Sequence, residues 1–265
     1  MSSPRRRVTA RDQQFLEWDT QQYALPIDMM ARWYGSGRSW TYELAEKLER
    51  LGKVERVYAT ETGPKTAAEL GQLGREGGPG RVPKSMWGPM WIVPTRATVH
   101  SFLGGSDPGP WTVRPSTAAH VRAVAELRLA LTGRDTSPNV WRSERLLRRD
   151  AAAGVEIGGP HPYCHDALFR DDSGKVWAVE CELSLKKGTG RMESVLMTSI
   201  SAARNLTDPL GGERVSGVIY FCRGADVANH VTRAKENLRA EHGDLAKTIH
   251  IRDLDTILEK RQVAA

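Results

Sequence analysis

The sequence has few of the features that mark exported, membrane-spanning or disulfide-bonded proteins. Its three cysteines, Cys164, Cys181 and Cys222, lie in apolar, strand-like runs and form no Cys-x-x-Cys pair. Such thiols are typical of reduced core residues, so we expect a cytoplasmic protein. No run approaches the ~18 apolar residues of a membrane span, and the basic start lacks the apolar stretch of a secretory signal. We therefore expect neither export nor membrane insertion.

Two ligand classes are disfavoured because their partner residues are missing. His161, Cys164 and His165 resemble half of a zinc site, but a structural zinc needs a second, separated pair of ligands, which the sequence does not offer. The glycine-rich segment 74–80 has neither the lysine–serine ending of a phosphate-binding loop nor a strand before it. The sequence thus predicts neither structural zinc nor ATP binding.

What is present is a basic composition suited to globular folding. The chain has 265 residues, a net charge of +6 and a pI near 9.3, and its length favours two domains. Residues 1–100 hold 15 Lys or Arg against 11 Asp or Glu, so the basic surplus leans toward the N-terminal part. Such a balance favours a nucleic-acid partner without identifying one.

The N-terminal part predicts three short helices, over 9–20, 26–34 and 39–51. Thr9 is the expected cap of the first helix and Ser39 that of the third. Three helices of this size, with a glycine-bearing turn before the third, resemble a helix-turn-helix.

A wing is expected to follow these helices. Segments 53–58 and 90–93 predict its two strands, and residues 59–86, rich in Gly, Pro, Thr and Lys, predict a mobile tip without core residues. A helix over 95–103 closes this part. The first domain is therefore expected to be a winged helix-turn-helix over 1–104, followed by a linking helix and loop over 105–140.

In a winged helix the third helix enters a DNA groove, and basic side chains around it contact phosphates. The expected groove-facing residues are Arg38, Ser39, Trp40 and Tyr42. The expected phosphate contacts are Arg5, Arg6, Arg7, Arg11, Lys53, Lys65, Arg81 and Lys84. The alternative is a small helical domain that binds protein.

The second half contains a row of acids. If 177–186 is a strand, Glu180, Glu182, Ser184 and Lys186 share one face and the residues between them form an apolar face. Segment 163–170 predicts a neighbouring strand and 171–175 the turn between the two. Asp166 and Glu180 would then face each other across a hairpin.

Clustered carboxylates suit a hard cation such as Mg2+, which would activate water and stabilise charge on a cleaved phosphodiester. A short helix over 141–149 can point Glu144 toward the same place. The alternative is an ordinary solvated strand face, on which such residues are common.

The remaining elements predict an α/β domain over 141–265. Helices and strands alternate after the hairpin, which indicates a mixed sheet with helices on its faces. The expected elements are helices over 117–132, 188–205, 226–241 and 255–261, and strands over 215–222 and 248–252.

Three motifs carry a resemblance to a known family. Trp-x-Ser-Glu-Arg at 141–145, His-Asp-Ala-Leu-Phe at 165–169 and Val-Glu-Cys-Glu-Leu-Ser-Leu-Lys at 179–186, after a region similar to a winged helix, resemble the replication-relaxation family of actinobacterial and Gram-positive mobile elements. The resemblance covers nearly the whole chain. It implies a plasmid or integrated-element protein that acts in replication or in DNA relaxation for transfer.

The same motifs are similar to the PD-(D/E)xK nuclease superfamily, which implies a restriction-endonuclease-like fold with Glu144, Asp166 and Glu180 as metal ligands. Two positions depart from the pattern, because His165 replaces the proline and Glu182 replaces the lysine. Some restriction endonucleases of this superfamily use glutamate there. Lys186 lies on the same predicted face, but an extended strand would place it roughly 13 Å from Glu182, too far to take the lysine's role.

Three functions are compatible with these patterns. The first is an accessory factor that binds double-stranded DNA and recruits other replication or transfer proteins, without hydrolysis or Mg2+. The second is a Mg2+-dependent DNA endonuclease; its catalytic residues would be Glu144, Asp166, Glu180, Glu182 and Lys186. The third is an adaptor that binds protein and no DNA. The sequence does not fix the oligomeric state, and a dimer is compatible with it.

Overall fold

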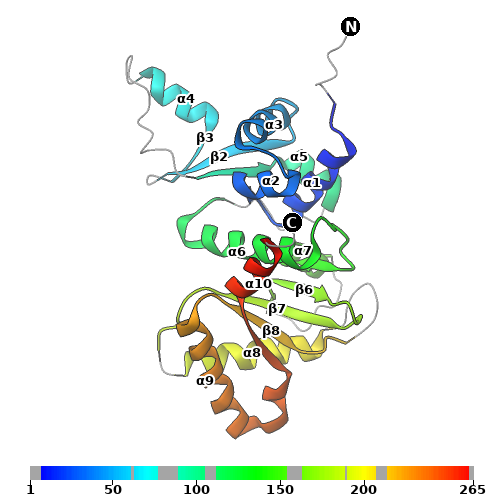
Figure 1. Cartoon of the computed structure of the whole chain (residues 1–265), viewed down its shortest axis with the longest axis vertical. Coiled ribbons are helices and arrows are strands. Elements are labelled where there is room, and N and C mark those ends of the chain that lie inside the picture. Colours follow the sequence, from blue (N-terminus) through cyan, green and yellow to red (C-terminus); the bar gives the residue numbers. More distant parts are fainter. Residues whose placement is uncertain are drawn as a thin grey trace. The chain divides into compact units, whose positions relative to one another are not determined.

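The computed structural model describes residues 7–60, 63–76, 89–104, 112–153, 163–188, 190–206 and 214–262. The chain is mixed α/β with two sheets and divides into two compact units, Met1–Ala125 and Glu126–Ala265 (Figure 1). Helix α6, Pro115–Thr132, contributes residues to both units. Among the described helices, none is both long and apolar enough to cross a membrane.

The first unit begins with the three predicted helices, α1 (Ala10–Gln21), α2 (Ile27–Tyr34) and α3 (Arg38–Arg50). The Thr9 side chain caps α1, as predicted, and Asp12 completes the capping box. The cap predicted for α3 is wrong: Gly37 is the N-cap and Ser39 lies exposed in the first turn. Thr41 donates its hydroxyl to the Gly37 carbonyl at 2.9 Å, which fixes the start of α3 one residue before Ser39.

A four-stranded antiparallel sheet packs with these helices. Its order is β1-β4-β2-β3, where β1 is Leu25–Pro26, β2 Val54–Thr60, β3 Gly63–Thr66 and β4 Met90–Pro94. The two predicted wing strands, β2 and β4, pair directly. Strand β1 was not predicted because two residues carry no periodic pattern. It joins the sheet by pairing with β4 at Ile92 and Trp91.

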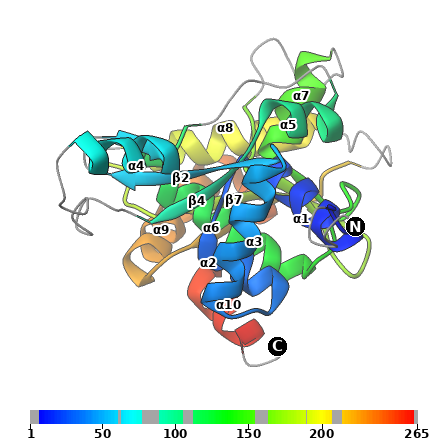
Figure 2. The ribbon, with the colours of Figure 1, turned by 90° about the horizontal axis from the view of Figure 1, so that it is seen from above.

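The expectation of a mobile tip without core is wrong for residues 63–76. Strand β3 and helix α4, Ala67–Glu76, lie there, beside β2 in Figure 2. At the start of α4 the Thr66 backbone N–H donates to the Glu69 carboxylate at 2.6 Å, and the Glu69 backbone N–H donates to the Thr66 hydroxyl at 3.2 Å. Leu70 of this helix is buried. Residues 77–88 lie outside the described part. Helix α5, Arg96–Leu103, follows β4 as predicted, and the Thr95 side chain caps it.

The second unit is built on a five-stranded mixed sheet in the order β5-β6-β7-β8-β9. The strands are β5 Trp141–Ser143, β6 Ala167–Arg170, β7 Val176–Glu182, β8 Val218–Cys222 and β9 Ile249–Asp253. Strands β5 to β7 pair antiparallel, and β7 to β9 pair parallel. The helices are α7 Glu144–Ala152, α8 Arg191–Asn205, α9 Ala225–His242 and α10 Leu254–Gln262. The predicted mixed sheet is confirmed.

One predicted element of this unit is wrong in part. Residues 141–143 form strand β5 instead of the first turn of a helix, and α7 starts only at Glu144. Trp141 is fully buried and pairs in register with Phe169 of β6, so packing in the sheet outweighs the local helical pattern. Glu144 therefore lies in the first turn of α7, directly after the sheet.

A buried carboxylate joins the first three helices of the first unit. Asp12 of α1 accepts hydrogen bonds from the Tyr34 hydroxyl at 2.9 Å, the Lys47 ammonium at 3.0 Å and the Thr9 backbone N–H at 3.0 Å. Burial alone would raise the pKa of Asp12, but the bonds from Thr9, Lys47 and Tyr34 hold that pKa below its ordinary value. The ionised side chain therefore stabilises the fold.

We expect Asp12→Asn to lower the free energy of unfolding by about 2 kcal/mol at pH 7, the usual worth of a hydrogen bond to a charged group. Because the folded-state pKa is depressed, this stability is present at neutral pH and is lost as pH falls through that pKa. Urea unfolding followed by tryptophan fluorescence should show the difference between wild type and variant shrinking in acid. Glu43→Gln, which removes an exposed carboxylate of α3, is the matched control, and an equal effect there would contradict the prediction.

Candidate active site

The hairpin of β6 and β7 brings the predicted acids together. Ala167 pairs with Val179, and the Asp166 N–H donates to the Val179 carbonyl at 3.1 Å, so Asp166 lies opposite Glu180. The Asp166 carboxylate accepts the Cys181 backbone N–H at 2.7 Å. This is the arrangement across the hairpin that the sequence pattern predicts.

The acid row is not a solvated face. Glu180 and Glu182 are only 9% and 6% exposed. Val176 and Ala178, which precede them on the same face of β7, belong to the core formed with α8 and α9. Both faces of β7 are covered, so the alternative of an ordinary exposed strand face is wrong. Burying two carboxylates at the end of a core strand is costly unless they are paired or bind a cation.

Glu180 lies at the centre of the cluster. Its carboxylate is 2.7 Å from Nδ1 of His165 and is hydrogen-bonded by the side chain of Tyr163. Burial raises the pKa of Glu180 well above its ordinary value, and the negative charge of Asp166 raises it further. Glu182 and Glu144 add to this effect. The other three predicted acids therefore all act on Glu180.

Lys186 reaches the cluster, contrary to the sequence-based expectation. Its ammonium group lies 2.9 Å from a carboxylate oxygen of Glu182. The expected separation assumed an extended strand through 186, but β7 ends at Glu182, where its last pairing is with Cys222 of β8. The Ser184 N–H then bonds the Glu182 side chain at 3.4 Å, and the chain turns back. A positive charge thus stands next to Glu182.

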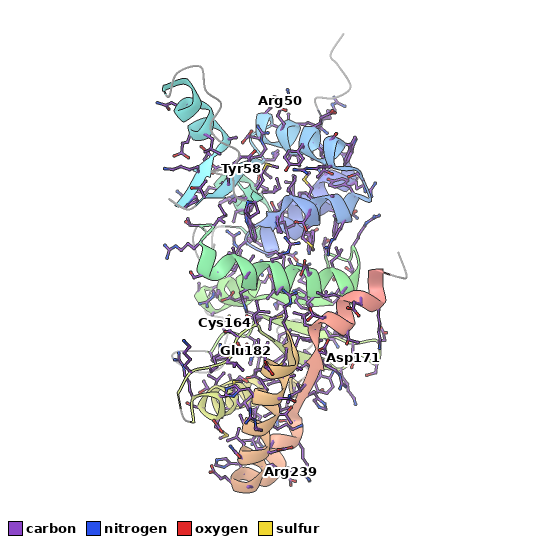
Figure 3. The ribbon with its side chains drawn as sticks, turned by 60° about the vertical axis from the view of Figure 1, so that its left-hand side comes forward. Arg50, Tyr58, Cys164, Asp171, Glu182 and Arg239 are labelled. Atoms are coloured by element: carbon purple, nitrogen blue, oxygen red, sulfur yellow. The ribbon has the colours of Figure 1, made fainter. Side chains whose placement is uncertain are left out.

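Glu144 enters from the helix that follows β5. Its backbone N–H donates to the Asp166 carbonyl at 2.9 Å, which ties the start of α7 to the start of β6. Its side chain pairs with Arg148 at 2.6 Å on the exposed side of α7. Figure 3 shows Cys164 and Glu182 in the same part of the unit, away from Asp171 in the hairpin turn. The cluster thus lies at the end of β7, opposite the turn.

A buried hydrogen bond supports the cluster from the neighbouring strand. Tyr220 of β8 pairs in register with Glu180, and its hydroxyl lies 2.6 Å from the Ser199 hydroxyl of α8. Burial raises the pKa of Tyr220, and the charge of Glu180 acts in the same direction. These hydroxyls therefore remain neutral and fix β8, the strand that pairs with β7, against α8.

The roles of Tyr163 and His165 were not predicted from the sequence. Strict alternation would put His165 and Glu180 on different faces, because Asp166 faces Glu180. Strand β6 begins only at Ala167, so 163–166 is not bound by that alternation. Burial lowers the pKa of His165 to about 4, so the imidazole is neutral at pH 7. Of the half zinc site, His161 lies outside the described residues.

The donor set suits Mg2+ in chemistry. Hard cations take carboxylate oxygens. Glu180 has two hydrogen-bond partners, the Tyr163 side chain and the neutral His165 ring, and neither carries a positive charge that would offset an ionised Glu180. The side chains are not already gathered around one metal position: the described residues contain no group of three or more His, Cys, Asp or Glu so arranged. The Glu144 side chain, which pairs with Arg148, would have to turn toward Glu180 for three acids to share a metal ion.

The predicted DNA contacts of the first unit differ in their surroundings. Arg7, Arg38, Ser39 and Trp40 are exposed, and the Arg38 guanidinium lies 5.5 Å from the centre of the Tyr42 ring. Arg11 donates to the Tyr34 carbonyl at 2.8 Å, so it also caps α2. Lys53 and Lys65 are half-buried. The described part of the chain does not include Arg5, Arg6, Arg81 and Lys84.

Comparisons of the chain with protein-family models, with curated proteins and with solved structures give no match. The function is therefore inferred from the residues of the site and their arrangement.

We expect Glu180→Gln to stabilise the metal-free protein by about 1 kcal/mol at pH 7, because glutamine replaces a carboxyl group whose ionised form is disfavoured by burial and by three other acids. Thermal and urea unfolding in EDTA measure the change. Glu193→Gln is the control, since hydrogen bonding to Asn237 lowers the pKa of that exposed carboxylate and its neutralisation brings no such gain. A loss of stability in Glu180→Gln would contradict the proposed repulsion.

Proposed function

We propose that the chain binds double-stranded DNA through its first unit and nicks it with Mg2+ through its second, in the replication or transfer of a plasmid or integrated element. The observation that carries this proposal is that three further acids lie near enough to the buried Glu180 to raise its pKa, while Lys186 contacts one of them. The pKa of Glu180 is raised by the negative charges of Asp166, Glu182 and Glu144. The Lys186 ammonium contacts the Glu182 carboxylate. The link to mobile elements depends on the motif resemblance to the replication-relaxation family.

The order of elements supports a nuclease-like second unit. The first acid begins helix α7, the second lies directly before β6, the first strand of the β6–β7 hairpin, and the third lies on β7. Helix α8 and the parallel strand β8 follow. This is the order in which the PD-(D/E)xK pattern presents Glu144, Asp166 and Glu180. The return of Lys186 to Glu182 supplies the cation that the motif otherwise lacks.

Each side chain can be given a role. Asp166 and Glu180 would hold Mg2+, with Glu144 as a further ligand. A bound Mg2+ supplies an activated water and offsets charge on the phosphodiester. Lys186 would neutralise charge that develops on the phosphate, and Glu182, paired with it, would orient the attacking water and accept its proton.

The first unit has an arrangement that supports a winged helix. Helices α1 to α3 precede the hairpin of β2 and β3, and the short β1 pairs with the returning β4. Trp40, 47% exposed at the start of α3, and the neighbouring Arg38 and Ser39 offer contacts to a groove. Glu43 and Glu46 are also exposed on α3, which favours contacts through its first turn over contacts along its whole length.

A second candidate function is the accessory factor that binds DNA without cleaving it. The specific observation in its favour is that the acids already have partners within the protein. Asp166 accepts the Cys181 N–H, Glu182 pairs with Lys186, and Glu144 pairs with Arg148. If those bonds persist in the DNA complex, the cluster stabilises the fold and binds no Mg2+.

Nicking of supercoiled plasmid tests the first function. With Mg2+ or Mn2+ the wild type should produce open-circular DNA, and Asp166→Ala should lower the rate at least about 100-fold, because it removes a ligand to the charge-stabilising cation. Asp172→Ala, in the exposed hairpin turn, is the matched control and should retain activity. DNA binding without nicking under either metal would favour the accessory factor.

DNA binding by the first unit should depend steeply on salt, with a slope of log affinity against log salt of about −0.9 per phosphate contact. Arg38→Ala should weaken binding by about 1–3 kcal/mol, because it removes a groove-facing side chain at the start of α3. Fluorescence anisotropy with a labelled duplex measures both quantities. Arg239→Ala, an exposed arginine on α9 (Figure 3), removes the same charge from the second unit and should leave binding unchanged.

A salt-independent affinity, or no binding of duplex at all, would favour the third function, a protein-binding adaptor. An equal effect of the two arginine substitutions would show that overall charge, and not the start of α3, determines binding.

A further inference from the structure

The residue before Asp166 does more than shape the turn into β6. His165 is 1% exposed, and its Nδ1 lies 2.7 Å from Oε1 of Glu180. The similar nuclease pattern has proline at this position, and proline has no side-chain hydrogen-bonding group. The contact is therefore a feature of this chain's own site.

We propose that His165 is a positioning residue that holds one oxygen of Glu180 so that the other is presented to a divalent cation. This inference rests on the proposed Mg2+-dependent function. Fixing a ligand by a hydrogen bond to its second oxygen is a common way in which proteins raise metal affinity, because the ligand loses less rotational freedom on binding.

The direction of the bond follows from chemistry. An ionised carboxylate only accepts hydrogen bonds, so with Glu180 ionised the hydrogen is on Nδ1 of His165. Nε2 then carries no hydrogen. Nε2 is buried without a hydrogen-bond partner, so a hydrogen on Nδ1 is the one that has an acceptor.

Neighbouring residues make this hold rigid. The Tyr163 side chain hydrogen-bonds Glu180, and its ring packs edge-on against the His165 ring, with 5.2 Å between the ring centres. Cys164 lies between them, with its thiol 3.8 Å from the Glu144 carbonyl. The Asp166 carboxylate is in turn fixed by the Cys181 N–H. Each of residues 163 to 166 thus contacts a site residue or β7, and these contacts tie His165 to the cluster.

A matched pair of variants separates positioning from packing. His165→Asn places an amide N–H close to where Nδ1–H is, whereas leucine has the same branching and number of side-chain heavy atoms as asparagine but no donor. Both lose the ring to the same extent, so a difference between them reports the hydrogen bond. His165→Phe keeps the ring volume without a donor and is the comparison to use if the smaller side chains do not fold.

The test is isothermal titration of the whole protein with Mn2+ and with Mg2+, without DNA, together with the unfolding midpoint of each variant in EDTA. We expect one site in the wild type that Asp166→Ala removes. His165→Leu and His165→Phe should weaken its affinity about 10- to 100-fold, the usual effect of losing a residue that supports a metal ligand. His165→Asn should restore most of the affinity.

The outcomes separate this inference from the function on which it rests. If the wild type shows no metal binding that depends on Asp166, the proposed Mg2+ function fails and the role of His165 fails with it. If the wild type binds metal and His165→Leu or His165→Phe binds equally well, only the positioning role is overturned. If asparagine is as weak as leucine, the ring's packing matters and the donor does not, which also overturns it.

Discussion

A carboxylate buried at the end of β7 is the constraint around which the second unit is arranged. Glu180 is 9% exposed and lies among three further acids, which is unfavourable in the absence of a cation. The protein tolerates it because β7 is held on both sides, by β6 through the hairpin and by β8 through the parallel pairing with Tyr220. The rigid sheet thus stabilises a charge arrangement that the side chains alone would not adopt.

The end of β7 determines which residues can join this carboxylate. Pairing with β8 stops at Glu182, and the chain turns, so Lys186 returns to Glu182 instead of continuing away from it. On the other side, regular pairing in β6 begins only at Ala167, which frees His165 from strand alternation. A positive group and a neutral hydrogen-bonding group reach the acids for the same reason: each lies just beyond a strand end.

These strand ends also explain which features could be predicted from the sequence. Periodic patterns and caps predict α1, α5 and the β6–β7 hairpin, and with them the approach of Asp166 to Glu180. Positions that depend on where pairing stops were not predicted, such as Lys186 near Glu182 and His165 near Glu180. Likewise, tertiary packing of Trp141 turned a helical pattern into strand β5, because local sequence does not encode its partner Phe169.

Two buried acids in this chain show how surroundings separate stability from function. Asp12 accepts three hydrogen bonds, one from the Lys47 ammonium, and its pKa is lowered, so ionisation stabilises the helices it joins. Glu180 has neutral partners and acidic neighbours, and its pKa is raised, so ionisation weakens the fold unless a cation is present. Structural roles account fully for the first arrangement. The second costs stability without an evident structural return, which is typical of sites that bind or react.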